Sequence, residues 1–317
     1  MNTTIRFHQY GAPSVLQIED DAIGTPGAGQ VRLRHEAIGV NFIDTLFRQG
    51  TYPVPLPSVP GVEGVGIVEA LGPGVTGIEA GQRMAYYLAP GSYTQQRLIG
   101  VEHLVPVPDY LPAEVVAAVL TKGLTAWAGL NGYHQLQPGQ TVLVQGAASA
   151  VGNLLARWAK ASGAVVIGTA GSPDKRAALA PAIDHVLPSD APDLAAQLKA
   201  LVPQGIDVVY EFVGKATFAA TLAAVRDGGT IVAIGSASGA PDIDQNEITR
   251  RRISMVGGPM ANYLQGRVGE ATAAVFDAYR RGLLGKVSFT RYALVDAVQA
   301  HADIAERRKA GSLVLIP

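Results

Sequence analysis

Residues 142–169, VLVQGAASAVGNLLARWAKASGAVVIGT, constrain the fold of this chain more than any other segment. An apolar run leads into a turn of Gly, Ala and Ser, an amphipathic stretch follows, and a second apolar run closes the segment. This order is typical of a strand, a tight turn, a helix and a parallel strand. The alternation continues downstream, which predicts a doubly wound α/β sheet with helical crossovers on both faces. We expect strands at 141–145, 164–169, about 185–187, 207–211, 230–235 and near 252–256, and helices at 152–162, 174–180 and 192–202.

The small-residue turn suits a phosphate group. Backbone amides at a helix N-terminus carry partial positive charge, and bulky side chains there would keep an anion away. In the dinucleotide fold the spacing is Gly-x-Gly-x-x-Gly, and the corresponding positions here are Ala147, Ser149 and Gly152. Only the third glycine is present, so an ordinary tight turn of another α/β protein explains this stretch equally well.

The end of the next strand bears on the cofactor. An NAD site usually has an acidic residue about 20 residues after the glycine motif, which binds the ribose 2′-hydroxyl. This chain instead has GTAGSPDKR at 168–176, with Thr169, Gly171 and Ser172 followed by Lys175 and Arg176. Hydroxyl groups and two cations suit a 2′-phosphate, which favours NADPH over NADH. The alternative is that both cations belong to a solvated first helical turn.

The flanking regions have a different character. The first 110 residues are rich in Gly and Pro and contain short apolar runs at 31–40, 64–71 and 93–99, which predicts a mostly antiparallel unit. Residues 112–133 have helical spacing. The last 60 residues contain expected helices around 268–282 and 295–308 and the strand SLVLIP.

Composition excludes several classes of protein. The chain has 317 residues, of which 48% are hydrophobic and 16% charged, so it can bury a core and is not disordered. Its net charge of -1 lacks the basic footprint of a nucleic-acid-binding protein. It has no cysteine, which excludes disulfides, thiolate zinc sites and cysteine nucleophiles. Without a recognisable signal peptide or an uninterrupted apolar run of membrane-spanning length, a globular cytoplasmic protein is expected.

Several segments in the same order resemble one family. They are AIGVNFIDTLFRQGTYP (37–53), PGVEGVGIVEALGPGV (60–75), TKGLTAWAGL (121–130), the AASAVG turn, VVYEFVG (208–214), AIGSASG (233–239) and GSLVLIP. The chain thus resembles the zinc-free, zeta-crystallin-like quinone oxidoreductases of the medium-chain dehydrogenase/reductase superfamily. The resemblance implies a GroES-like domain formed by 1–122 and 263–317, with a Rossmann domain at 123–262 inserted into it. It also implies a cofactor and substrate cleft between the domains, NADPH as cofactor, a quinone or related electrophile as substrate, and a homodimer.

The zinc-dependent relatives carry Gly-His-Glu where this chain has Gly61, Val62 and Glu63. A catalytic zinc needs about three protein ligands, and the six histidines (8, 35, 103, 134, 185 and 301) are scattered along the chain. We therefore expect no metal, and Glu63 is expected to be a hydrogen-bonding residue of the turn.

The resemblance also assigns site residues. Asn41, Phe42, Ile43 and Asp44 match the segment at the nicotinamide end, and Tyr52 matches an aromatic residue at the substrate mouth. The other positions that match cofactor-binding residues are Thr125, Ala150, Val151, Gly152, Gly171, Ser172, Lys175, Val213, Ser236 and Arg307. Three have simpler alternatives: Asn41 as a structural cap, Thr125 bonded to its own helical turn, and Arg307 as an exposed helical residue.

Some positions depart from the family pattern. Leu46 and Ser189 stand where relatives often have Tyr, and Gly258 stands where they have Arg before Pro. These departures bear on the substrate and on the NADPH preference. The expected reaction is hydride transfer to a quinone, with protonation by water or by Tyr52. The alternatives are a zinc-free reductase of enals or enones, a non-catalytic NADPH-binding protein, and structural accumulation of the crystallin type. The segment RRRISMVGG could supply an edge strand for dimerisation.

Overall fold

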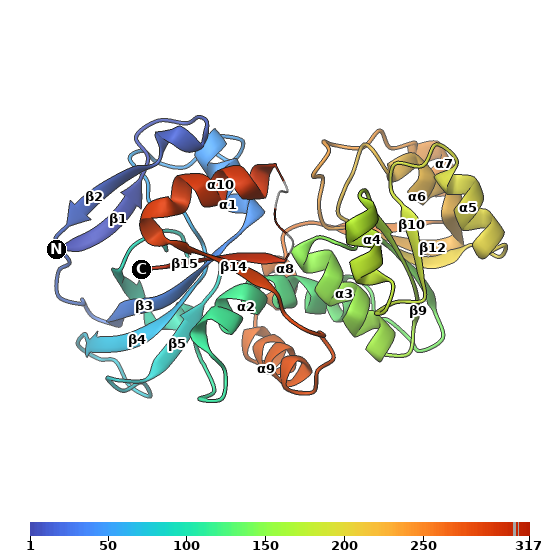
Figure 1. Ribbon diagram of the computed structural model, residues 1–317. Coiled ribbons are helices and arrows are strands. Elements are labelled where there is room, and N and C mark those ends of the chain that lie inside the picture. The colour runs from blue at the N-terminus through green and yellow to red at the C-terminus, as the bar shows by residue number, and fades with distance from the viewer. Residues whose placement is uncertain (307–308, 310) are drawn as a thin grey trace. The chain divides into compact units, whose positions relative to one another are not determined.

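The computed structural model describes residues 1–306, 309 and 311–317, and the chain divides into two compact units (Figure 1). The first unit contains Met1–Thr121 and Val287–Pro317, and the second contains Lys122–Lys286. The sequence placed the return to the first unit at residue 263, whereas the structure places it at Val287. The reason is helix α9 (Val268–Arg280), which packs within the second unit so closely that a Cβ on Gly123 would lie 2.6 Å from Val275 Cγ1.

The second unit contains the parallel sheet that the sequence predicts. Its six strands, as far as the structure describes the chain, lie in the order β10-β9-β8-β11-β12-β13, and every neighbouring pair is parallel. The central strands consist mainly of buried Val, Ile and Leu, as expected for a sheet covered on both faces. The strands are β8 (Thr141–Gln145), β9 (Val165–Ala170), β10 (His185–Pro188), β11 (Ile206–Glu211), β12 (Val225–Ala233) and β13 (Ser254–Gly257).

Helices connect these strands, and the helices after β8, β9, β10 and β11 each begin within seven residues of the preceding strand. Short connections of this kind bring the N-termini of these helices to the carboxyl edge of the sheet. The helices of this unit are α3 (Ala150–Ala161), α4 (Pro173–Leu179), α5 (Leu194–Leu201), α6 (Phe218–Ala224), α7 (Gln245–Arg250), α8 (Ala261–Leu264) and α9.

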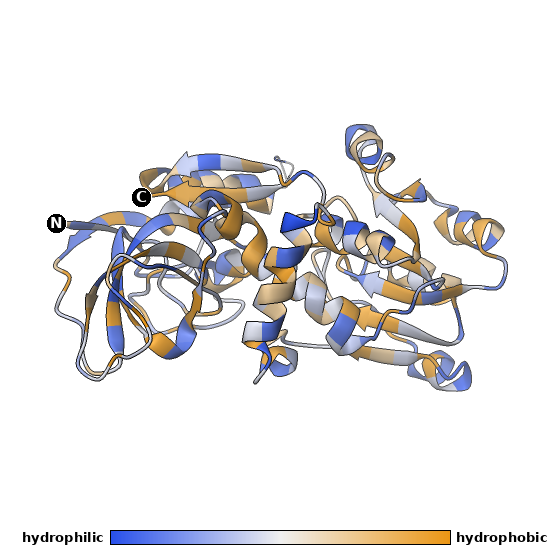
Figure 2. Ribbon diagram, turned by 90° about the horizontal axis from the view of Figure 1, so that it is seen from below, coloured by the Kyte–Doolittle hydropathy of each residue, from blue (hydrophilic) through white to orange (hydrophobic). Residues whose placement is uncertain are grey.

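The first unit is mainly β, as the sequence predicts. Among the described residues, a seven-stranded sheet has the order β14-β15-β3-β4-β5-β7, with β6 paired to β3, and β1 and β2 form a separate ribbon. Buried and less buried residues alternate along the first eight residues of β3. Figure 2 shows hydrophobic and hydrophilic bands interleaved along the strands of the protein. The strands are β1 (Asn2–Arg6), β2 (Gln17–Asp21), β3 (Gln30–Val40), β4 (Gly64–Leu71), β5 (Arg83–Tyr86), β6 (Gln96–Gly100), β7 (Leu104–Pro106), β14 (Phe289–Ala293) and β15 (Ser312–Ile316).

Three longer helices belong wholly or partly to the first unit. They are α1 (Phe42–Gln49), α2 (Ala113–Trp127) and α10 (Ala297–Ala305). Helix α2 continues into a π-helical turn, η3 (Ala128–Tyr133). By length and composition alone the 21 residues Ala113–Tyr133 could cross a membrane, but 78% of their most apolar window is buried inside the protein. Burial of this extent is what a core helix shows.

Candidate functional site

The small-residue turn joins β8 to α3, and its shape depends on two glycines. Gly146 begins the turn in the left-handed region, with a φ of 75°. A Cβ on Gly152 would lie 2.4 Å from the carbonyl oxygen of Gly146. Any side chain at position 152 would therefore prevent the close approach of helix α3 to the turn. The third glycine of the motif, Gly152, therefore permits the close packing of helix α3 against the turn.

Ser149 determines which amides at this helix start stay available. The first amides of a helix have no partner within the helix. Ser149 is the N-cap residue and its hydroxyl accepts from the amide of Gly152 at 3.0 Å, while the amide of Asn153 donates to the carbonyl of Ser149 at 2.9 Å. Among the described residues, no group accepts a hydrogen bond from the amides of Ala150 and Val151. Because residues 146–149 of the turn itself are only Gly, Ala and Ser, this helix start fits a diphosphate.

The end of β9 continues into α4. Ser172 is the N-cap of α4, and its hydroxyl accepts from the amide of Lys175 at 3.4 Å. Arg176 folds back onto the turn, where its guanidinium donates to the carbonyl of Gly171 at 2.8 Å. Ser189 Oγ lies 3.6 Å from where a Cβ on Gly171 would be. Hydroxyl groups and the cations Lys175 and Arg176 therefore lie at or next to this strand end. The guanidinium of Arg176 is already hydrogen-bonded to the backbone.

Thr169 does not belong to this group, although the sequence placed its hydroxyl there. Its side chain is fully buried. The hydroxyl donates to Gln145 Oε1 at 2.6 Å and accepts from the amide of Gly146 at 3.2 Å. Because side chains alternate between the two sides of a strand, Thr169 faces the interior of the unit and holds the first residue of the small-residue turn.

A buried polar network, which the sequence analysis missed, lies behind the turn. Glu211 ends β11 and is 1% exposed. Its Oε1 accepts from the amides of Val213 at 2.8 Å and Gly214 at 3.0 Å, and its Oε2 accepts from the hydroxyl of Thr221 at 2.7 Å. Thr221 in turn accepts from Gln145 Nε2 at 3.1 Å. One carboxylate thus ties the loop after β11 to the ends of β8 and β9.

Two predicted groove residues lie in the loops after β11 and β12. Val213 Cγ2 lies 3.1 Å from where a Cβ on Gly146 would be, so its side chain stands against the small-residue turn. Ser236 follows β12, and its Cα lies 3.0 Å from where a Cβ on Gly214 would be. Both residues therefore lie at the carboxyl edge of the sheet.

In the first unit, the predicted segment Asn41–Asp44 begins helix α1. Asn41 is the N-cap residue, and Asp44 Oδ2 accepts from its amide at 2.8 Å. The Asn41 side chain is 7% exposed and donates to Glu63 Oε2 at 2.9 Å. Phe42 is 43% exposed, so this helix start presents an apolar surface beside a mostly buried amide.

Asp44 is buried and connects to the C-terminal part of the first unit. Its Oδ2 also accepts from the hydroxyl of Tyr93 at 3.2 Å, and Tyr93 Oη lies 3.0 Å from His301 Nε2. Burial lowers the pKa of His301 to about 3, so its imidazole is neutral at physiological pH. Through its bonds to the Asn41 amide and the Tyr93 hydroxyl, Asp44 holds the start of α1 against the rest of the first unit.

The remaining predicted residues lie in three different settings. Tyr52 is 51% exposed and its ring packs near that of Phe47. The hydroxyl of Thr125 lies 3.2 Å from Met260 Sδ. Arg307 lies outside the described residues.

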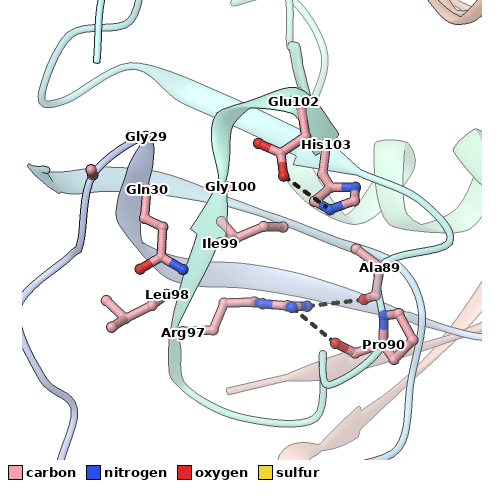
Figure 3. A pocket seen from close by; sticks show the side chains of 11 residues that line it. Gly29, Gln30, Ala89, Pro90, Arg97, Leu98, Ile99, Gly100, Glu102 and His103 are labelled. Atoms are coloured by element: carbon pink, nitrogen blue, oxygen red, sulfur yellow. Dashed lines mark hydrogen bonds and ion pairs between the residues drawn. The ribbon is translucent and has the colours of Figure 1, made fainter. Parts of the chain in front are cut away.

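Figure 3 shows a surface pocket of the first unit, with a volume of about 420 Å³. Arg97 donates there to the carbonyl groups of Ala89 and Pro90, and His103 lies 3.5 Å from Glu102. The described residues that are predicted to bind cofactor do not line this pocket. Within the described part of the chain, no cluster of His, Cys, Asp and Glu is suitable for a metal ion.

Comparison with known proteins places these features in context. The family model "Alcohol dehydrogenase GroES-like domain" matches residues 27–109, and "Zinc-binding dehydrogenase" matches residues 150–276. The quinone oxidoreductase of Pseudomonas aeruginosa is 37% identical over all of this chain and all of its own. The 2-haloacrylate reductase of a Burkholderia species is 35% identical over 98% of this chain and 97% of its own. The crystal structure of Escherichia coli quinone oxidoreductase complexed with NADPH has a TM-score of 0.94 and 33% identity, covering 99% of this chain and 100% of that one.

Proposed function

We propose that this chain, which belongs to the quinone oxidoreductase family of the medium-chain dehydrogenases/reductases, reduces quinones with NADPH by direct hydride transfer and without a metal. The protein is an NAD(P)H-dependent oxidoreductase. The observation that carries the finer proposal is the turn before α3, where the amides of Ala150 and Val151 stay available beside a strand end with hydroxyl groups and cations.

The second unit would hold the nucleotide. The amides of Ala150 and Val151 suit the pyrophosphate, and Ser172 and Lys175 suit a 2′-phosphate on the adenosine ribose. Near this strand end an NAD site usually has an acidic residue. Thr169 is uncharged and buried, so it does not repel a 2′-phosphate. NADPH, when bound, supplies the hydride. Gly171, Val213 and Ser236 would line the groove beside it.

The first unit would supply the nicotinamide end. Asn41 offers an uncharged amide beside a ring whose charge changes during turnover, and Phe42 and Ile43 offer apolar cover that excludes water. Thr125, in the part of α2 that belongs to the second unit, is proposed to face the nicotinamide carboxamide, and Arg307 is proposed to reach the cofactor. Holding donor and acceptor together in a dry site accounts for most of the required rate enhancement.

Proton delivery to the reduced quinone is assigned to water or to the hydroxyl of Tyr52. The exposure of Tyr52 fits a residue at a substrate mouth. Replacement by Phe removes only the hydroxyl group. If Tyr52→Phe has an unchanged turnover rate and an unchanged pH profile, water is the donor.

A second candidate function is reduction of an activated carbon–carbon double bond. The 35% identity to a 2-haloacrylate reductase favours it. The same hydride donor serves both reactions, and Leu46, where relatives often have Tyr, removes one hydrogen bond that a quinone oxygen could use. A panel of quinones, enones and haloacrylates, each compared by kcat/KM, separates the two functions.

The cofactor preference is tested by oxidation of NADPH and NADH with one quinone. A charge-assisted contact to the 2′-phosphate contributes about 1.5–3 kcal/mol, so we expect kcat/KM to be roughly 10–100-fold higher with NADPH. Lys175→Gln should remove most of this preference by weakening NADPH use and leaving NADH use unchanged. Lys199→Gln, on the exposed side of α5, is the matched control. Equal rates with both cofactors in the wild type would refute the 2′-phosphate assignment, and no oxidation with any acceptor would refute the proposed function.

A further inference from the structure

We propose that Glu63 is a positioning residue that fixes the orientation of the Asn41 side-chain amide, so that Asn41 offers a hydrogen-bond acceptor and not a donor to its ligand. The inference rests on the proposed function, because it takes the nicotinamide end of the cofactor as that ligand. Glu63 follows Gly61 and Val62, the positions compared above with the Gly-His-Glu of the zinc-dependent relatives, and the proposal gives its carboxyl group a role without a metal.

The Asn41 amide nitrogen has two acceptors. Nδ2 donates to Glu63 Oε2 at 2.9 Å and to the carbonyl oxygen of Gly39 at 3.3 Å. A backbone carbonyl only accepts hydrogen bonds, and so does a carboxylate. The opposite orientation would direct Asn41 Oδ1 at two acceptor oxygens, so the surrounding groups determine which way the amide points.

Glu63 is itself held in place. The carboxyl group is fully buried, and its Oε1 accepts from the amide of Thr121 in α2 at 2.8 Å. A Cβ on Gly39 would lie 2.2 Å from Glu63 Oε2 and 2.5 Å from the carbonyl oxygen of Ala117. The backbone of β3 therefore reaches the carboxyl group only because residue 39 has no side chain, and strand β3, helix α2 and the start of α1 meet at Glu63.

This geometry limits the role of Asn41. Both hydrogens of its amide are engaged, which leaves Oδ1 for a ligand. The capping box of α1 also turns the Asn41 side chain toward the amide of Asp44, and an amide oxygen with two lone pairs can accept from that amide and from a ligand. An acceptor suits the carboxamide NH2 group of nicotinamide or a ribose hydroxyl group, and it does not suit the carbonyl oxygen of a quinone. Asn41 therefore positions the cofactor and does not polarise the quinone, which refines its proposed catalytic role.

Glu63→Gln tests the orientation with almost no change in shape. The amide of Thr121 needs a carbonyl oxygen as its acceptor, so the NH2 group of the introduced glutamine faces Asn41 and forces Asn41 to turn its Oδ1 away from the ligand. Loss of one such hydrogen bond corresponds to a roughly tenfold increase in the dissociation constant. We expect NADPH to bind roughly tenfold more weakly, whereas 2′-phospho-ADP-ribose, which lacks nicotinamide, binds as in the wild type. Glu69→Gln is the matched control, because Glu69 lies on strand β4, which begins directly after Glu63, in a partly exposed ion pair with Arg34.

A reciprocal exchange keeps the test independent of one variant. Asn41→Asp alone sets two carboxyl groups against each other and should also weaken NADPH binding. In the double variant Asn41→Asp with Glu63→Gln, the introduced glutamine donates to the introduced aspartate, whose second carboxylate oxygen is again an acceptor for the ligand. We expect NADPH affinity in the double variant to exceed that of either single variant. Affinities that fall additively would overturn the proposal.

A spectroscopic measurement separates this proposal from the proposed function. In protein labelled with ¹⁵N-asparagine, the Asn41 side-chain NH2 signal, identified by its loss in Asn41→Asp, should exchange slowly with water in the wild type and faster in Glu63→Gln. Unchanged exchange overturns the orientation argument whether or not NADPH is the cofactor. A wild type that does not bind NADPH but shows this exchange difference would refute the proposed function and leave the orientation confirmed. Equal weakening of NADPH and 2′-phospho-ADP-ribose in Glu63→Gln would reduce Glu63 to a general structural role.

Discussion

At the scale of single residues, two histidines of the first unit are buried and neutral. His35 Nδ1 lies 2.7 Å from the carbonyl oxygen of Thr94, and its Nε2 lies 2.6 Å from Tyr86 Oη. His301 is also fully buried beside Tyr93. Burial lowers the pKa of both histidines to about 3, because a charged imidazole would lose its hydration there.

These pKa values predict a loss of stability in mild acid. Between the unfolded value of about 6.5 and the folded value of about 3, the unfolded chain binds protons that the folded chain does not. The free energy of unfolding should therefore fall as the pH decreases through this window, by about 1.4 kcal/mol per pH unit for each histidine. Urea unfolding at a series of pH values measures this slope. His301→Gln should lower the slope by the contribution of one buried histidine, about 1.4 kcal/mol per pH unit. His185→Gln, at an exposed position, should leave the slope unchanged.

Single residues also mark the limit of the sequence analysis. The sequence correctly predicts that Glu63 forms hydrogen bonds, but nothing near it in the sequence indicates Asn41 or Thr121 as partners. Both contacts join residues far apart along the chain, and only the folded sheet brings them together. For Thr169 the prediction was wrong. Its position at a strand end suggests a ligand contact, whereas its side chain faces the interior.

At the scale of elements, the network around Glu211 should stabilise the carboxyl edge of the sheet. Thr221→Val keeps the shape of the side chain but leaves Glu211 Oε2 without the hydroxyl donor of Thr221 and Gln145 Nε2 without its acceptor. Unpaired buried groups of this kind cost about 2–4 kcal/mol in total. We expect that loss in chemical denaturation. Thr249→Val is the control, since Thr249 is exposed and bonds only its own helix, and it should cost less than about 0.5 kcal/mol. Equal losses in both variants would contradict this account.

The elements themselves were largely predictable. Runs of Val, Ile and Leu between helical patterns predicted all six parallel strands, because a sheet buried on both faces needs continuous apolar strands. Every strand end agrees within two residues except the start of β12, which lies five residues before the predicted one. The network at their ends was not predictable. Gln145 and Glu211 are polar residues at the ends of apolar runs, and such residues face solvent or the interior according to tertiary packing, which one sequence does not encode locally.

At the scale of the whole molecule, the sequence predicted two units but not where the chain returns to the first one. The segment 263–286 contains the helix predicted around 268–282, and the apolar face of a helix does not specify which unit it packs against. The contact between Val275 and Gly123, in the part of α2 that belongs to the second unit, joins this helix to that unit. It depends on a glycine in another helix, so the amphipathic pattern alone could not supply it.

The expected homodimer is a further proposal at this scale. Strand β13 is the last strand in the order of the parallel sheet, so one edge of its backbone lacks a neighbouring strand among the described residues. Such an edge can pair with a second copy of the same chain. Light scattering coupled to gel filtration should then give twice the 33.0 kDa mass of a single chain.

Lysine substitutions on the two edge strands of the sheet identify which edge forms the dimer. Ser254→Lys sets a charge on the exposed start of β13 and should shift the mass toward that of one chain, because an edge lysine opposes strand pairing. His185→Lys sets the same charge on β10, which is the opposite edge of the same sheet, and should leave the dimer intact. A dimer that survives Ser254→Lys but dissociates in His185→Lys would move the interface to β10. A wild type with the mass of one chain at every concentration would remove the dimer from the proposal, and since each unit carries its own described site residues, it would leave the assignment of the cofactor unaffected.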